Sequence, residues 1–155
     1  MLYEALRELP VQVDSFETET LSRPISPEFT RKTTVIHLRG DGEEGVGEDV
    51  TYAPGEHDAS HFPRIELAGE WTLASLAVRL DQVDLFPAGE PGQAAFRDYR
   101  RWAFESAALD LALRQAGRSL ADALGREPRP VTFVSSTRAT SLLSERARKH
   151  PGHRS

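Results

Sequence analysis

The sequence contains no cysteine and no asparagine, and lysine occurs only as Lys32 and Lys149. The lack of cysteine excludes a disulfide framework, a thiolate metal site and a cysteine nucleophile. It is compatible with a reducing compartment. Chemistry that requires a lysine has only two candidates, and the scarcity of lysine beside abundant arginine indicates a GC-rich coding bias.

Long apolar runs and clustered positive charge are missing as well. No run approaches the roughly 20 apolar residues of a membrane-spanning helix, and residues 1–10 carry two glutamates in place of the apolar core of a signal peptide. The net charge is −5, and the arginines are scattered. This balance argues against a nucleic-acid or membrane partner. We therefore expect a cytoplasmic protein.

What the chain has is enough apolar sequence for one core, since 39% of its 155 residues are hydrophobic. The first half has the pattern of strands. Residues 9–16 alternate Val11 and Val13 with polar neighbours, and residues 31–40 are rich in β-branched residues. Asp-Gly at 41–42 predicts a hairpin turn into a returning strand at 46–52. Proline-marked loops are expected at 17–29 and 53–64.

The second half has the pattern of helices. Thr72 is a predicted N-cap for a helix over 72–80, and a longer helix is predicted from 94 to 116, ending at Gly117. Its apolar residues lie on more than one face, so we expect one of these faces to lean on a neighbour outside this sequence. A short helix follows and ends at Gly125. The expected fold is α+β, a three-stranded antiparallel meander followed by a helical layer.

A composition change near Arg126 predicts a domain boundary there. Two prolines precede an apolar, β-branched strand predicted at 131–134, and an amphipathic helix is predicted after residue 140. We therefore divide the chain into residues 1–126 and 127–155. The predicted strand at 131–134 has no partner in the sequence after it, so it either joins the meander or begins a larger structure.

Two stretches resemble the N-terminal capping domain of the enolase superfamily, in its mandelate racemase and muconate-lactonizing branch. They are GVGED at 45–49 and FESAALDLALRQAGRSLADALG at 104–125. The first is similar to a glycine–aromatic–glycine–glutamate strand, although Val46 replaces the aromatic residue. The helix at 72–80 and RPVTFVSSTR at 129–138 fit the same order, the latter as a first barrel strand. The resemblance spans roughly residues 10–138.

The resemblance implies that residues 127–155 are the first strand and part of the first helix of an incomplete (β/α) barrel. Complete members carry out Mg²⁺-dependent isomerase or lyase reactions (racemase, cycloisomerase or dehydratase), by abstracting the proton beside a carboxylate to form an enediolate. Their metal ligands and catalytic lysines would fall beyond this sequence. We therefore expect no catalytic or metal-binding residue and no cofactor here. Mg²⁺ and a small carboxylate substrate are expected only with a complete barrel.

The resemblance also suggests substrate-contact residues. Arg23 lies in one predicted selectivity loop, and Tyr52, His57 and His61 lie in the other; Ser135 and Ser136 end the predicted barrel strand. Each has a plain alternative as an exposed loop residue. Glu56, His57, Asp58 and His61 also form a candidate zinc cluster, but the prolines around them limit any helix to one turn, so a solvated loop is favoured.

Three acidic residues are candidates for structural anchors. Glu48 belongs to the glycine–glutamate strand, while Glu105 and Asp110 interrupt the apolar helix. The last two are expected either to meet arginines or free backbone groups, or to be solvated.

Two hypotheses of function remain open. In one, the chain is the capping and specificity part of an enolase-superfamily enzyme, inactive as a truncated fragment. In the other, it is a non-enzymatic α+β interaction module from a truncated gene product. In both, uncovered apolar surface predicts self-association or association with a missing barrel.

Overall fold

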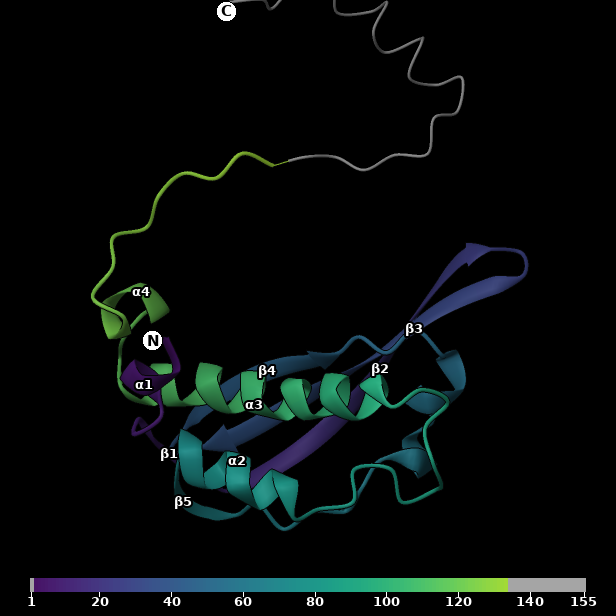
Figure 1. The fold of residues 1–155 in the computed structure, drawn as a ribbon, viewed down its shortest axis with the longest axis horizontal. Coiled ribbons are helices and arrows are strands. Elements are labelled where there is room, and N and C mark those ends of the chain that lie inside the picture. Colours follow the sequence, from purple (N-terminus) through teal and green to yellow (C-terminus); the bar gives the residue numbers. More distant parts are fainter. Residues whose placement is uncertain (1, 134–155) are drawn as a thin grey trace, which may run out of the picture.

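The computed structural model describes residues 2–133, which form an α+β fold (Figure 1). An antiparallel sheet of three strands has the order β2-β3-β4, a two-stranded sheet pairs β1 with β5, and helices follow. The predicted fold class is confirmed for this part of the chain. The elements are α1 (Leu2–Leu6), β1 (Pro10–Val13), β2 (Ser15–Ser26), β3 (Phe29–Gly40), β4 (Glu43–Asp49), the 3₁₀ turns η1 (Pro54–His57) and η2 (Ala59–His61), β5 (Gly69–Thr72), α2 (Leu73–Asp81), α3 (Ala95–Gln115) and α4 (Leu120–Ala123).

The turn between β3 and β4 agrees with the sequence. Asp41 and Gly42 both have positive φ, 50° and 77°. Two consecutive residues of this kind form the tight turn whose twist matches that of the flanking strands. The predicted hairpin is therefore confirmed, and its register pairs Gly40 with Glu43.

The predicted loop at 17–29 is wrong. Apart from the turn residues 27–28, these residues belong to β2 and β3, which form a long hairpin that projects beyond the rest of the molecule (Figure 1). Pro24 lies within β2, where the register shifts between Pro24 and Ser26. Because β2 pairs only with β3, it is an edge strand, and edge strands accept proline. We refer to residues 21–33 as the arm.

The predicted first strand at 9–16 is split between two sheets. Residues 10–13 pair with β5, and pairing with β3 begins at Ser15. The first strand of the meander is thus β2, and β5 was not expected from the sequence. Val11 and Val13 are buried as predicted, at 2% and 0% exposure.

Helices α2, α3 and α4 occupy their predicted places, whereas α1 was not predicted. Thr72 caps α2 through a reciprocal pair of hydrogen bonds with Ser75. Gly117 and Gly125, which follow α3 and α4, both have φ of 60°, the left-handed conformation that commonly ends a helix.

Helix α3 lies along the sheet (Figure 1), and β4 approaches it closely because Gly45 and Gly47 face it. A Cβ atom at Gly47 would overlap the carbonyl oxygen of Ala103, and one at Gly45 would overlap that of Ala107. Two glycines opposite two alanines thus set the distance between strand and helix.

The apolar faces of α3 are enclosed by this chain itself. Phe104, Ala108 and Leu111 have no exposed surface, and they belong to one core with Ile36 and Leu38. The expectation that this surface leans on a neighbour outside the sequence is therefore wrong for these residues. Trp102, by contrast, is 55% exposed.

Residues 131–133, the described part of the predicted barrel strand, have no regular secondary structure, and Phe133 is 89% exposed. Val134, Ser135, Ser136 and the predicted helix after residue 140 lie outside the described residues.

Candidate functional site

The second predicted selectivity segment lies between β4 and β5 and contains only the short 3₁₀ turns η1 and η2. This confirms the prediction that the prolines of this segment limit any helix in it to one turn. His57 differs from the prediction of a solvated loop, since it is only 1% exposed. Its Nε2 lies 2.8 Å from the carbonyl oxygen of Thr51, and its Nδ1 lies 3.0 Å from Oγ1 of Thr34. A carbonyl can only accept, so Nε2 donates to Thr51, while Nδ1 is paired with the hydroxyl of Thr34. Both nitrogens are engaged, which leaves neither free for a substrate or for zinc.

His61 and Tyr52 remain partly or largely accessible. His61 Nδ1 donates to the carbonyl of Gly55 at 3.0 Å, and the residue borders a shallow pocket of about 270 Å³ with Glu56 and Glu90. Tyr52 is 68% exposed, and the guanidinium of Arg31 stacks on its ring at 4.9 Å from the centroid. Within residues 2–133 no three His, Asp or Glu side chains are grouped as a metal site would require.

A buried ion pair, not anticipated from the sequence, holds this segment against α3. Arg100 and Asp49 are both fully buried, with Arg100 Nε 3.0 Å from Asp49 Oδ2. The other Asp49 oxygen accepts from the amide and the hydroxyl of Thr51. The guanidinium also lies between two aromatic rings, 4.1 Å from the centroid of Phe62 and 3.8 Å from that of Phe86.

The remaining Arg100 donors bind backbone carbonyls of three separate segments. They reach Glu56 at 2.6 Å, Leu85 at 2.9 Å and His61 at 3.2 Å. Burial lowers the pKa of the Arg100 guanidinium from its ordinary value, and the hydrogen bond with Asp49 opposes that shift. The sequence contained a signal for the burial of Arg100. This residue lies four positions from both Phe96 and Phe104, on the buried stripe of α3.

Two of the three predicted acidic anchors have the expected partners. Asp110 Oδ2 accepts from the backbone N–H of Val46 at 3.0 Å and from Arg114 at 3.1 Å. Glu105 binds Arg101 at 2.8 Å, and Arg101 also binds Asp81. Glu48 lies on the opposite face of β4, away from α3.

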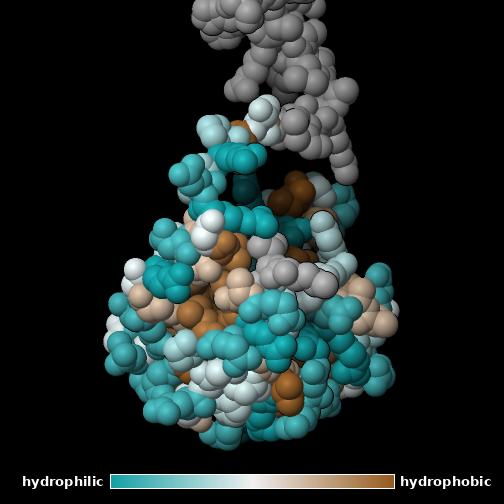
Figure 2. Space-filling model, turned by 60° about the vertical axis from the view of Figure 1, so that its left-hand side comes forward, coloured by the Kyte–Doolittle hydropathy of each residue, from teal (hydrophilic) through white to brown (hydrophobic). Residues whose placement is uncertain are grey.

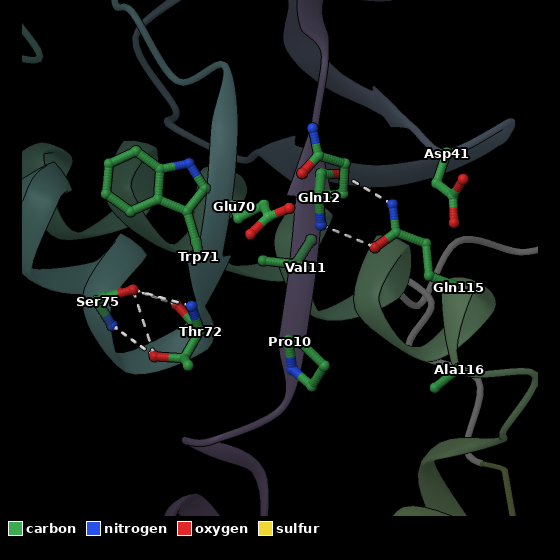
Figure 3. Close-up of a pocket in the computed structure, with 10 residues that line it drawn as sticks. All are labelled: Pro10, Val11, Gln12, Asp41, Glu70, Trp71, Thr72, Ser75, Gln115 and Ala116. Carbon is green, nitrogen blue, oxygen red and sulfur yellow. Dashed lines mark hydrogen bonds between the residues drawn. The ribbon is translucent and has the colours of Figure 1, made fainter.

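The side-chain amide of Gln115, at the end of α3, forms hydrogen bonds with β1 of the kind that a neighbouring strand would form. Its oxygen accepts from the N–H of Gln12 at 3.0 Å, and its nitrogen donates to the carbonyl of Gln12 at 2.8 Å (Figure 3). The same nitrogen donates to the carbonyl of Gly40 at 2.9 Å. The amide thereby covers the free edge of β1. It borders an open groove of about 590 Å³ together with Trp71 and Glu70 of β5.

A smaller apolar cleft of about 160 Å³ lies between α1, α2 and α3. Its lining includes Tyr3, Leu6, Leu73 and Leu109. Figure 2 brings this side forward and shows apolar side chains gathered among hydrophilic ones.

One face of the β2-β3-β4 sheet points away from α3 and is here called the outer face. Registers place the following side chains on it: Ser15, Glu17, Glu19, Leu21 and Arg23 of β2, Arg31, Thr33, Val35, His37 and Arg39 of β3, and Glu44, Val46 and Glu48 of β4. Tyr52, which Arg31 contacts, extends it. Leu21 and Val46 are 46% and 41% exposed.

The outer face brings together residues from both predicted selectivity segments. Arg23 pairs in register with Arg31, and Arg31 contacts Tyr52. The two segments are also linked on the inner side, where the hydroxyl of Thr20 donates to the carbonyl of His57 at 3.1 Å. Arg23 and Tyr52 therefore lie at one end of the sheet, whereas His57 is withdrawn into the core.

Within residues 2–133 no helix has the length and apolarity needed to cross a bilayer.

Comparisons with known proteins place the chain in a family. No curated protein and no solved structure matches the chain significantly. Residues 4–123 match the model described as the N-terminal domain of a domain of unknown function, DUF8230. Since the match spans well over half of the sequence, the chain belongs to the DUF8230 N-terminal domain family.

Proposed function

We propose that the domain formed by residues 1–126 is a non-enzymatic recognition module that binds a protein surface through its outer face. The observation that carries this proposal is the composition of that face. Leu21, Val46 and Tyr52 are large apolar or aromatic side chains that remain 41–68% exposed, beside one end of the face that carries two arginines and another that carries four glutamates. Exposed apolar groups within a polar surround are typical of protein interaction sites.

The polar groups of the interior support a structural role for the rest of the domain. His57, Asp49 and Arg100 each have their donors or acceptors engaged by the chain itself. The family description as an N-terminal domain, with a match that ends at residue 123, supports a boundary near Arg126. We also propose a cytoplasmic location, with no nucleic-acid or membrane partner, on the basis of the net charge of −5.

The test uses an apolar fluorescent dye, anilinonaphthalene sulfonate, at low protein concentration. The variant Leu21→Ser/Val46→Ser/Tyr52→Ser is expected to lose most of the dye fluorescence while its free energy of unfolding changes by less than about 1 kcal/mol, because exposed side chains contribute little to folding. The control Val78→Ser removes an exposed valine of α2, 56% exposed, and should leave the dye signal unchanged. Unchanged fluorescence in the triple variant, or its unfolding, would refute the proposal.

A second candidate is the cap of an enolase-superfamily isomerase or lyase. It is favoured by one observation, that Arg23 and Tyr52 from the two predicted selectivity segments both lie beside Arg31 at one end of the sheet. The described residues hold no metal cluster, so Mg²⁺ and a small carboxylate substrate would belong to a barrel, and no chemical step is assigned to residues 2–133. The test is the coding sequence that follows residue 155. Barrel strands bearing paired lysines and three acidic ligands would support this candidate, and their absence would remove it.

A further inference from the structure

We infer that the outer face binds the outer face of a second copy of this chain, in a two-fold arrangement that reverses the strand direction. The inference rests on the proposed function, since it names the partner of the same surface. It draws on the distribution of charge along the strands and on the apolar side chains, of which Leu21 lies between the arm arginines and the acidic rows while Val35 and Val46 lie among the glutamates.

The outer face is basic at one end and acidic at the other. At the arm, the cross-strand pair Arg23 and Arg31 brings two positive charges together. Towards the other end, Val35 separates Glu19 from Glu48 in one row of the register, and Glu17 lies in the next row. Glu17 and Glu19 are 64% and 60% exposed, so this acidic end is open to a partner.

Part of the acidic end is already neutralised within the chain. Arg39 binds Glu17 at 2.8 Å and Glu44 at 3.1 Å. His37 lies 3.5 Å from Glu19 and 3.2 Å from Glu44. When histidine is counted as neutral, Arg39 offsets one of the four glutamates at this end, which leaves an excess of three negative charges. The arm carries two positive charges.

A surface with opposite charges at its two ends is complementary to itself when it is turned end over end. A two-fold axis that lies between two stacked sheets, perpendicular to their strands, performs this operation. It places the arm of each copy over the acidic end of the other, and the same contact occurs twice, as in other isologous dimers. Stacked sheets lie about 10 Å apart, which brings Leu21, Val35 and Val46 of both copies into the space between them.

The net charge of the whole molecule restricts how a second copy can bind. The net charge of −5 repels another copy at long range. Association therefore depends on the local pairing of unlike ends, and like-charged ends would meet if the strands ran in the same direction. The reversed orientation follows from this repulsion as well as from the attraction.

The experiment is a charge exchange followed by sedimentation equilibrium. Variant X carries Arg23→Glu and Arg31→Glu, so both ends of its outer face are acidic. Variant Y carries Glu19→Arg and Glu48→Arg, so basic charge dominates both ends. We expect the unchanged protein to dimerise, with a dissociation constant that rises with salt. X alone and Y alone should each show a dissociation constant at least about tenfold higher, and an equimolar mixture should return to within about threefold of the unchanged protein.

The control is Arg118→Glu/Arg126→Glu, which changes the net charge as much as X does but lies before and after α4. It should dimerise like the unchanged protein, and thermal melts followed by circular dichroism verify that every variant is folded. The inference is overturned if the unchanged protein is monomeric at about 100 μM, a concentration at which even weak dimers form, if X and Y dimerise as well as it does, or if their mixture stays monomeric. Dye binding that still maps to the outer face of a monomeric protein would overturn the second copy as partner and leave the recognition module standing.

Discussion

At the scale of single residues, polar side chains join segments that are far apart in the sequence. Arg100 connects β4, the turns η1 and η2, and the segment before α3, and Asp49 balances its charge in the interior. Asp110 and Gln115 of the same helix cover backbone groups of β4 and β1. Since a buried charge that loses its partner is strongly unfavourable, Arg100 should matter more to stability than any exposed arginine of α3.

The substitution Arg100→Met tests this. Methionine fills the space between Phe62 and Phe86 but leaves the Asp49 carboxylate buried without its cation, so we expect the free energy of unfolding to fall by about 3 kcal/mol or more. Urea denaturation followed by tryptophan fluorescence measures the change. The control Arg97→Met, one turn earlier, breaks exposed pairs with Glu90 and Asp84 and a contact over the ring of Phe86, and it should cost less than about 1 kcal/mol. Equal effects of the two substitutions would show that the Arg100 contacts are dispensable.

At the scale of elements, the close approach of β4 to α3 depends on the absence of side chains at Gly45 and Gly47. The sequence predicted both elements, because the spacing of apolar residues marks a helix and the Asp-Gly turn marks a hairpin. It did not predict that they touch. The split of residues 9–16 between two sheets also escaped prediction, since the partner β5 is short and lies more than fifty residues away.

The substitution Gly47→Ala is expected to lower the free energy of unfolding by about 2 kcal/mol or more, because its Cβ would overlap the backbone of Ala103 and force the helix away from the strand. Thermal unfolding by circular dichroism measures it. Gly55→Ala is the matched control, since nothing lies within 4 Å of its added Cβ, and it should change stability by less than about 0.5 kcal/mol. A neutral Gly47→Ala would mean that the helix and strand can separate at little cost.

At the scale of the whole molecule, the arm stands apart from the core. Residues 21–30 are all exposed, and the core residues of β3 begin further along the strand. The hydrophobic core of the described residues surrounds α3 and includes no side chain of the arm. A segment that adds little to the core yet keeps apolar and basic side chains in the open is better suited to binding than to folding.

Shortening the arm separates these two roles. If residues 23–31 are replaced by Asn-Gly, Ser22 and Lys32, which already pair in register, are joined by a two-residue turn. We expect the fold to be kept, with a change of less than about 1 kcal/mol in the free energy of unfolding because no core side chain is removed. Association measured by sedimentation should be lost. A large loss of stability would show that the arm supports the core.

The sequence by itself determined the local elements of this protein: the β3–β4 turn, the caps of α2 and the ends of α3 and α4. These depend on neighbours a few residues away, and the conformational preferences of glycine, threonine and aspartate act at that range. Only the tertiary structure decided that His57 is buried, that residues 17–29 are an arm, that Arg100 and Asp49 form a pair, and that Arg23 and Tyr52 share an outer face. Those outcomes depend on burial and on partners in other segments, such as Thr34 for His57 and Asp49 for Arg100, because a side chain's environment is created by whichever segments pack around it.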